Sequence, residues 1–120
     1  MKYMLMIYDN PDTRSVFFGP DGDALMAEMN ALMAELTESG ELVSTDALAD
    51  PASSKVVRVR DGVPVITDGP LAEAKEHFGG YLIVDCDSEA RAVDIAARWP
   101  NAKFTAMEVR PILDISGEEM

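Results

Sequence analysis

A seven-residue run near the N-terminus is apolar on both of its alternating faces. The run Lys2–Tyr8 (KYMLMIY) is short and is followed by the turn formers Asp9-Asn10-Pro11-Asp12, which favours a β-strand over a helix. Its two faces would carry Met4, Met6 and Tyr8 on one side, and Tyr3, Leu5 and Ile7 on the other. A strand that is apolar on both faces is covered on both faces. Any fold for this chain must therefore provide two covering layers.

Two segments have the periodicity and the end signals of amphipathic helices. The first follows Asp21-Gly22-Asp23, where either aspartate can cap the helix, and it stops at Gly40. Its apolar stripe is formed by Leu25, Met29, Leu32 and Leu36, and we interpret it as core packing. The second helix is predicted at Glu89–Trp99, before Pro100. Residues Thr13–Pro20 are predicted to form a loop.

Further strands are predicted at Glu41–Leu48, Tyr81–Cys86 and Met107–Leu113, with a hairpin between the first two. The hairpin has arms at Lys55–Arg60 and Val63–Thr67, joined by Asp61-Gly62. Asp-Gly between two β-branched runs is the strongest short-range hairpin signal. Pro64 lacks an N–H, so its arm is expected at a sheet edge or to leave its partner at that position.

The order of elements is β-α-β, a hairpin insertion, and β-α-β. This pattern predicts an α+β, ferredoxin-like βαββαβ domain over residues 1–115, with residues 116–120 as a frayed tail. Two helices cover only one face of such a sheet. Three or four uncovered apolar side chains would forfeit roughly 1.5–3 kcal/mol each, close to a domain's whole net stability of about 5–15 kcal/mol. We therefore expect a two-fold homodimer with its sheets face to face.

The composition limits the class of partner. The chain has 120 residues, the size of one domain, and a formal net charge of −12. Such a field repels phosphate backbones and anionic lipid heads, so neither nucleic acid nor a membrane is an expected partner. The run Met1–Ile7 is too short for a secretory signal or a membrane span. The lone Cys86 suits a reducing compartment, and the predicted location is cytoplasmic.

The stretch Thr67–Gly80 concentrates ionisable groups between two predicted strands and holds the only histidine. Asp68, in the turn Asp68-Gly69-Pro70, is either a simple turn former or a general base aimed into a cleft. Glu73 and His77 are four residues apart, so one helical turn would place them together. A carboxylate beside an imidazole suits proton transfer, although a solvated helix end explains the same spacing. A third metal ligand is not evident, so no metal is predicted.

Four further residues are candidates for binding a small polar or anionic ligand. They are Lys75, Arg58, Arg110 and Tyr8, and Arg58 shares a face of the hairpin with Arg60. Three also have a structural interpretation: Lys75 as a surface lysine, Arg110 as the partner of a carboxylate such as Glu108 or Asp68, and Tyr8 as a packed ring. Cys86 has no basic neighbour in sequence and is interpreted as inert core. The sequence has no Walker motif, Gly-rich phosphate loop, CxxC pair or Ser-His-Asp pattern, so no cofactor is predicted.

Several segments together resemble the YCII-related proteins of the DGPF type. They are KYMLMIY, VRVRDG, TDGPLAEAKEHFGGYLIVD, EARAVDIAARWP and MEVRPI. The resemblance covers nearly the whole chain, with Leu71 where the family usually has phenylalanine. It implies a ferredoxin-like subunit that forms a dimeric α/β barrel, with a pocket near the DGP loop. It also implies a small bacterial protein, some relatives being associated with extracytoplasmic-function sigma factors. Better-described YCII proteins are thought to use a His–Asp pair with the histidine on the first helix. The predicted first helix here has none, so that pair does not carry over intact.

Three functional hypotheses follow. The first is a cofactor-free enzyme of the lyase or isomerase kind, in which Asp68 or His77 moves a proton and Glu73 orients His77. The second is a non-catalytic ligand-binding or regulatory dimer, linked to a sigma factor. The third is an interaction scaffold without a pocket.

Overall fold

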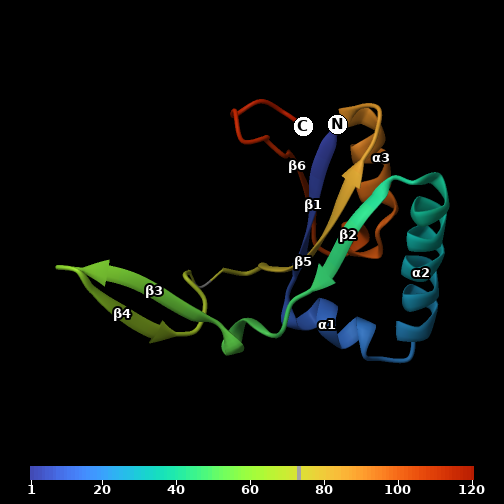
Figure 1. Cartoon of the computed structure of the whole chain (residues 1–120). Helices are drawn as coiled ribbons and strands as arrows, with labels where there is room; N and C mark the ends of the chain where they lie inside the picture. Colours follow the sequence, from blue (N-terminus) through green and yellow to red (C-terminus); the bar gives the residue numbers. More distant parts are fainter. Residues whose placement is uncertain (73) are drawn as a thin grey trace.

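The computed structural model describes residues 1–72 and 74–120 (Figure 1). Along the chain the elements are β1 (Lys2–Asp9), α1 (Pro11–Phe17), α2 (Gly22–Ser39), β2 (Leu42–Ala47), η1 (Pro51–Ser53), β3 (Lys55–Arg60), β4 (Val63–Asp68), β5 (His77–Asp85), α3 (Glu89–Arg98), η2 (Pro100–Lys103) and β6 (Met107–Pro111).

Four strands form one antiparallel sheet in the order β2-β5-β1-β6. This is the strand order of a split βαβ unit, and it confirms the predicted α+β, ferredoxin-like class. Both long helices, α2 and α3, lie on the same side of the sheet (Figure 1). β1 and β5 are central, so their side chains form most of the sheet's contribution to the core.

The core lies between the sheet and the two helices. Burial alternates along β1: Tyr3, Leu5 and Ile7 are buried, whereas Met4, Met6 and Tyr8 are only half-buried. The buried residues pack with Leu32 and Leu36 of α2, Leu82 and Val84 of β5, and Ala92 and Ile95 of α3. The apolar residues on the other face of β1 belong to a sheet face that no helix of the described residues covers. We call this face, which carries Met4, Met6, Tyr8 and Ile83, the open face.

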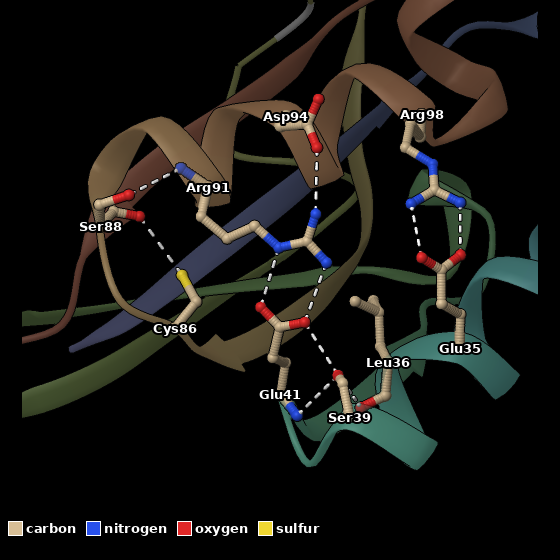
Figure 2. Close-up of polar contacts among 9 residues, drawn as sticks. All are labelled: Glu35, Leu36, Ser39, Glu41, Cys86, Ser88, Arg91, Asp94 and Arg98. Atoms are coloured by element: carbon tan, nitrogen blue, oxygen red, sulfur yellow. Dashed lines mark hydrogen bonds and ion pairs between the residues drawn. The ribbon is translucent and has the colours of Figure 1, made fainter.

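A polar cluster joins α3 to the corner between α2 and β2 (Figure 2). The Arg91 guanidinium donates two hydrogen bonds of 2.9 Å to the Glu41 carboxylate, one from Nε and one from a terminal nitrogen. The Ser39 hydroxyl donates to Glu41 Oε1 at 2.8 Å. The hydrogen bonds from Arg91, and then the one from Ser39, lower the pKa of Glu41 to about 2. Since Glu41 follows the C-cap Gly40, this ion pair fixes the end of α2 to α3.

A short helix, α1, occupies Pro11–Phe17, where the sequence predicted a loop. The prediction was wrong because Asn10-Pro11 was interpreted as a turn. Asn10 is instead the N-cap: its Oδ1 accepts the Thr13 backbone N–H at 2.8 Å. Pro11 occupies the first helical position, where a missing N–H carries no cost. The helix brings Arg14 close to the end of β1.

The hairpin has the predicted form. β3 and β4 pair antiparallel in a separate two-stranded sheet, which projects away from the four-stranded sheet (Figure 1). Asp61 and Gly62 have φ angles of 51° and 77°, as the primed hairpin turn requires. At the opposite end of the chain, residues 114–120 turn back, and the Met120 N–H donates to the Ile112 carbonyl at 2.8 Å.

Candidate functional site

His77 lies in the wall of a cavity at one end of the main sheet. It is the first residue of β5 and stands opposite Asp9, the last residue of β1. The imidazole is half-buried and lines a cavity of about 320 Å³ together with Asp9, Arg14 and Asp50. The cavity thus combines one imidazole, two carboxylates and one guanidinium from three separate parts of the sequence.

Asp9 is held in place from two sides. The Asn101 side chain, only 2% exposed, donates to Asp9 Oδ1 at 2.8 Å and to the Tyr8 carbonyl at 3.0 Å. The second carboxylate oxygen of Asp9 lies directly over Gly79, so a Cβ at position 79 would overlap it. The close approach of this carboxylate to the β5 backbone therefore requires glycine at position 79.

Arg14 reaches the cavity from α1 and is only loosely paired. Its Nε lies 3.8 Å from Asp50 Oδ2, and the two side chains are 34% and 56% exposed. The other oxygen of Asp50 accepts the Ala52 N–H at 2.9 Å and caps η1. An Arg–carboxylate pair at this distance is weak, so the guanidinium retains donors for a negatively charged ligand.

Two further cavities border the first. One of about 660 Å³ lies between the hairpin and the body, and His77 and Phe78 line it on the body side. Lys55, Val56 and Leu71 line it on the hairpin side. The other, of about 250 Å³, shares Asp9, Arg14 and Gly79 with the His77 cavity but has mainly apolar walls, which include Phe17, Met26, Met29 and Trp99.

The other described candidate residues do not line the His77 cavity. Among the residues that the structure describes, the lining of the His77 cavity does not include Asp68, Lys75, Arg58, Arg110 or Tyr8. Asp68 ends β4, is 83% exposed and forms an ion pair with Lys55 across the base of the hairpin. Lys75 and Arg58 are exposed. Glu73 lies outside the described residues.

The sequence predicted a helical turn that would bring Glu73 and His77 together. The described part of this segment is not helical. Residues 71, 72, 75 and 76 form bends, and His77 begins β5. Local spacing suggested a helix, but strand pairing prevails: His77 and Phe78 stand opposite Asp9 and Tyr8 of β1. The carboxylates that share the cavity with His77 are consequently Asp9 and Asp50, which come from distant parts of the chain.

Tyr8 and Arg110 lie on the open face and share one partner. The Tyr8 hydroxyl donates to Glu108 Oε2 at 2.7 Å, and this hydrogen bond is the main cause that raises the pKa of Tyr8. Arg110, 71% exposed, lies 3.5 Å from Glu108 Oε1. Glu108 is one of the two structural partners predicted for Arg110. The Tyr81 hydroxyl donates likewise to Asp46 at 2.7 Å, and this bond raises the pKa of Tyr81.

Sequence reasoning missed Asp9, Arg14, Asp50 and Asn101. The first three lie in segments that were interpreted as turns or loops. The Asn10-Pro11 cap signal could have revealed α1 and hence Arg14. Nothing local marks Asn101, which is 92 residues from Asp9 in the chain.

Three other predictions bear on the chemistry of the chain. Cys86 is buried, and desolvation is the main cause that raises the pKa of its thiol, in keeping with an inert core residue. Within residues 1–72 and 74–120, no group of three or more His, Cys, Asp or Glu side chains is placed to hold a metal ion. In the same part of the chain, no helix has the length and apolar character needed to cross a bilayer.

Comparisons with known proteins agree with this fold. The family model of the YCII-related domain matches residues 1–116. An uncharacterized protein of Rhizobium meliloti is 28% identical over 114 residues, which cover 93% of this chain and 92% of the relative. The solved structure of 5-chloro-2-hydroxyhydroquinone dehydrochlorinase from Burkholderia phenoliruptrix AC1100, in complex with 2,5-dihydroxybenzoquinone, superposes with a TM-score of 0.54. That match covers 99% of this chain and 100% of the other at 15% identity, so it bears on the fold alone.

Proposed function

The chain belongs to the YCII-related domain family, and on that premise we propose that it is a cofactor-free enzyme that transfers a proton on a small polar or anionic molecule. One observation carries the proposal: the only histidine of the chain is half-buried in a cavity of about 320 Å³, beside Asp9 and Arg14. A cavity of this size suits a small molecule.

The residues of the cavity suit distinct roles. Imidazole is the side chain best able to gain and lose a proton near neutral pH, so His77 is the proposed general acid or base. Arg14 would bind a negatively charged group of the substrate. Asp9, held by Asn101, would stabilise the protonated imidazole. His77 would take a proton from a carbon of the substrate and return it to another atom of the same molecule or to a leaving group, which is lyase or isomerase chemistry.

The roles predicted from the sequence for Asp68 and Glu73 stay predictions. Asp68 pairs with Lys55 at the base of the hairpin, which favours a structural role. Asp68→Asn in the assay below tests it as a general base. Lys75, Arg58, Arg110 and Tyr8 likewise stay candidates for ligand binding.

The structural neighbour guides the choice of first substrates. It is a dehydrochlorinase solved with a dihydroxybenzoquinone, so hydroxylated and chlorinated six-membered rings are reasonable first test compounds. The mainly apolar cavity next to His77 would accept the carbon skeleton of such a ring. Small carboxylic acids form the second test group because of Arg14.

A second candidate function is ligand binding without catalysis, in a regulatory dimer that acts with an extracytoplasmic-function sigma factor. Arg14 and Asp50 are 34% and 56% exposed, so the cavity of a single copy is accessible to solvent. Enzymes commonly exclude water during reaction, and an accessible cavity suits reversible binding.

We also propose that two copies pair through the open face. Met4, Met6 and Ile83 are half-buried on this face, and no helix of the described chain covers them. Covering an apolar side chain of this size stabilises by roughly 1.5–3 kcal/mol. A two-fold axis lets one surface cover its own copy.

The single histidine permits a direct binding test. The imidazole carbon-bound protons of His77 give the only histidine signals in an NMR spectrum, and a ligand in the cavity should shift them during titration. His77→Ala and Asp9→Asn should lower turnover by about 10²-fold or more while the circular dichroism spectrum stays unchanged. Asp23→Asn, on an exposed carboxylate in the first turn of α2, is the matched control.

The outcomes separate the candidates. Wild-type turnover by both His77→Ala and Asp9→Asn would refute the enzyme proposal. Ligand-induced shifts of the His77 signals without turnover on any test compound would favour the regulatory dimer. A chain that sediments as a monomer at all concentrations would refute the pairing through the open face.

A further inference from the structure

The His77 cavity and the apolar cavity beside it adjoin each other. Asp9, Arg14 and Gly79 line both the cavity of about 320 Å³ that contains His77 and the neighbouring one of about 250 Å³. One molecule can therefore occupy both, with its apolar part in the smaller cavity and its polar groups beside Asp9 and Arg14.

The walls of the smaller cavity suit a flat ring. Phe17 of α1 and Trp99 supply aromatic walls, and Met26 and Met29 of α2 supply thioethers. Aromatic pairs contribute about 0.5–1.5 kcal/mol beyond the area that they bury, and thioether sulfur makes favourable contacts with ring edges. An apolar cavity of roughly 150 Å³ holds a benzene molecule, so about 250 Å³ is enough for one six-membered ring. The cavity therefore favours a ring over a short aliphatic acid.

The charges around the two cavities disfavour a ligand that arrives as an anion. Among the residues that the structure describes, their lining carries one guanidinium, Arg14, and two carboxylates, Asp9 and Asp50. One positive charge against two negative charges leaves a formal charge of −1 when the imidazole is neutral, and the whole chain carries −12. This field repels an ionised acid but not an uncharged molecule.

Both carboxylates keep hydrogen-bonding capacity for an uncharged ligand. Oδ1 of Asp9 accepts the Asn101 amide at 2.8 Å, and Oδ1 of Asp50 accepts the Ala52 N–H at 2.9 Å. Oδ2 of Asp50 lies 3.8 Å from Arg14 Nε, which is longer than a hydrogen bond. An ionised carboxylate has about four acceptor sites and no donor. The ligand groups that match these carboxylates are therefore hydroxyls.

We propose that the substrate is an uncharged, hydroxylated six-membered ring. The ring lies in the smaller cavity, its hydroxyls donate to Asp9 and Asp50, and one ring oxygen lies beside Arg14. The inference rests on the proposed function and narrows its small polar or anionic substrate to this class.

In this arrangement Arg14 acts on negative charge that arises during the reaction. In the keto form of such a ring, His77 takes a proton from the carbon next to the carbonyl. The electron pair of the C–H bond forms a ring double bond, and the carbonyl π pair becomes a negative charge on the oxygen beside Arg14. His77 then returns its proton to that oxygen, which completes the isomerisation. Because the charge is absent from the ground state, Arg14 raises kcat more than it raises affinity.

The first test compares two ligands of similar size and needs no variant. Both 1,2-dihydroxybenzene and benzoate contain one six-membered ring, but only benzoate is ionised at neutral pH. Each is titrated by NMR against the imidazole signals of His77 and the indole N–H signal of Trp99, the only tryptophan. The dihydroxy ring should shift both sets of signals and bind at least about tenfold more tightly than benzoate. Equal or tighter binding of benzoate, or no shift of the Trp99 signal by either compound, would overturn the inference.

The second test uses Asp50→Asn, which keeps the shape and the capping ability of the side chain and removes one negative charge. The variant should bind 1,2-dihydroxybenzene roughly three- to tenfold more weakly, because a hydroxyl then meets a neutral acceptor. It should bind benzoate more tightly, because a repulsive charge is gone. Asp23→Asn, in the first turn of α2, is the matched control and should change neither affinity. An affinity for the dihydroxy ring that is unchanged or higher in Asp50→Asn contradicts the inference.

The third test separates binding from turnover in Arg14→Gln, with a ring substrate identified by the turnover assay. Its kcat should fall on the order of 100-fold while its KM changes less than about threefold. A higher KM with an unchanged kcat would mean that Arg14 binds a charge already present on the substrate, and the inference would be wrong. His77-dependent turnover of an ionised acid, faster than that of every uncharged ring, would refute this inference and leave the proposed function standing.

Discussion

Replacing Glu41 by glutamine should destabilise the fold at neutral pH and remove part of its pH dependence. The carboxylate is 18% exposed and accepts two 2.9 Å hydrogen bonds from Arg91, whose side chain is 31% exposed (Figure 2). The amide keeps the shape but loses the charge. It also leaves one Arg91 donor facing an NH₂ group.

The magnitude follows from the pKa of Glu41. The neighbouring Arg91 and Ser39 lower it from 4.5 to about 2. One pKa unit corresponds to about 1.4 kcal/mol, so the interaction has an upper limit of about 3 kcal/mol. Both partners retain contact with water, and solvent screening reduces the expected loss in the variant to about 1–2 kcal/mol.

The lowered pKa of Glu41 fixes the direction in which the stability of the fold changes with pH. Because the pKa is lower in the folded state, the stabilisation is fully present above pH 4.5 and is lost as the pH falls from 4.5 toward about 2. The difference in unfolding free energy between wild type and Glu41→Gln should therefore be constant from pH 7 to pH 5.5. By pH 3.5 roughly 40% of it or more should be lost.

The assay is urea unfolding, followed by the fluorescence of Trp99, the only tryptophan, which is 6% exposed. Chain concentration is held constant because a dimer adds a concentration term. Glu35→Gln is the control: its partner Arg98 is 42% exposed and Glu35 is 50% exposed, so solvent screening should make its loss of stability much smaller than that of Glu41→Gln. A stability difference for Glu41→Gln that is zero at pH 7, or that does not change down to pH 3.5, would refute the reasoning.

Three further substitutions test how the site and the core are built. Gly79→Ala should displace the Asp9 carboxylate, because the new Cβ would overlap its second oxygen. We expect the unfolding free energy in urea to fall by about 1–3 kcal/mol and the ligand-induced shifts of the His77 signals to weaken. An unchanged affinity for the ligand would contradict the positioning of Asp9. Asn101→Ala removes the 2.8 Å hydrogen bond to Asp9 and the 3.0 Å hydrogen bond to the Tyr8 carbonyl. The unfolding free energy should fall by about 1–3 kcal/mol, and a stability equal to wild type would show that water replaces the amide. Leu36→Ala, at a position that is 0% exposed, should lower the unfolding free energy by about 2–5 kcal/mol, whereas a loss below 1 kcal/mol would mean that the core can collapse around the gap.

The sequence determined the elements whose signals are local. The apolar run Lys2–Tyr8, the stripe from Leu25 to Leu36 and the turn Asp61-Gly62 each act within a few residues, and each element formed where it was predicted. Their order was enough to predict the ferredoxin-like sheet. The family resemblance, confirmed by the match over residues 1–116, rests on the same segments.

Where local signals compete, the tertiary structure decided. Asn10-Pro11 suits both a turn and a helix start, and here the Asn10 side chain caps α1 through a local hydrogen bond from the Thr13 N–H. The segment before His77 suited a helical turn, but pairing of His77 with Asp9 of β1 made it the start of a strand. That pairing joins positions far apart in the chain, and a sequence window cannot detect it.

The candidate site depends most on such long-range contacts. The sequence identified His77 as the chemical group of interest, because it is the single histidine in a region rich in charge. It could not identify Asp9 or Asn101 as its neighbours, since they come together only through the register of β1 and β5 and the placement of η2. The sequence shows the chemical type of each residue, whereas the set of residues that share one cavity depends on how the sheet folds.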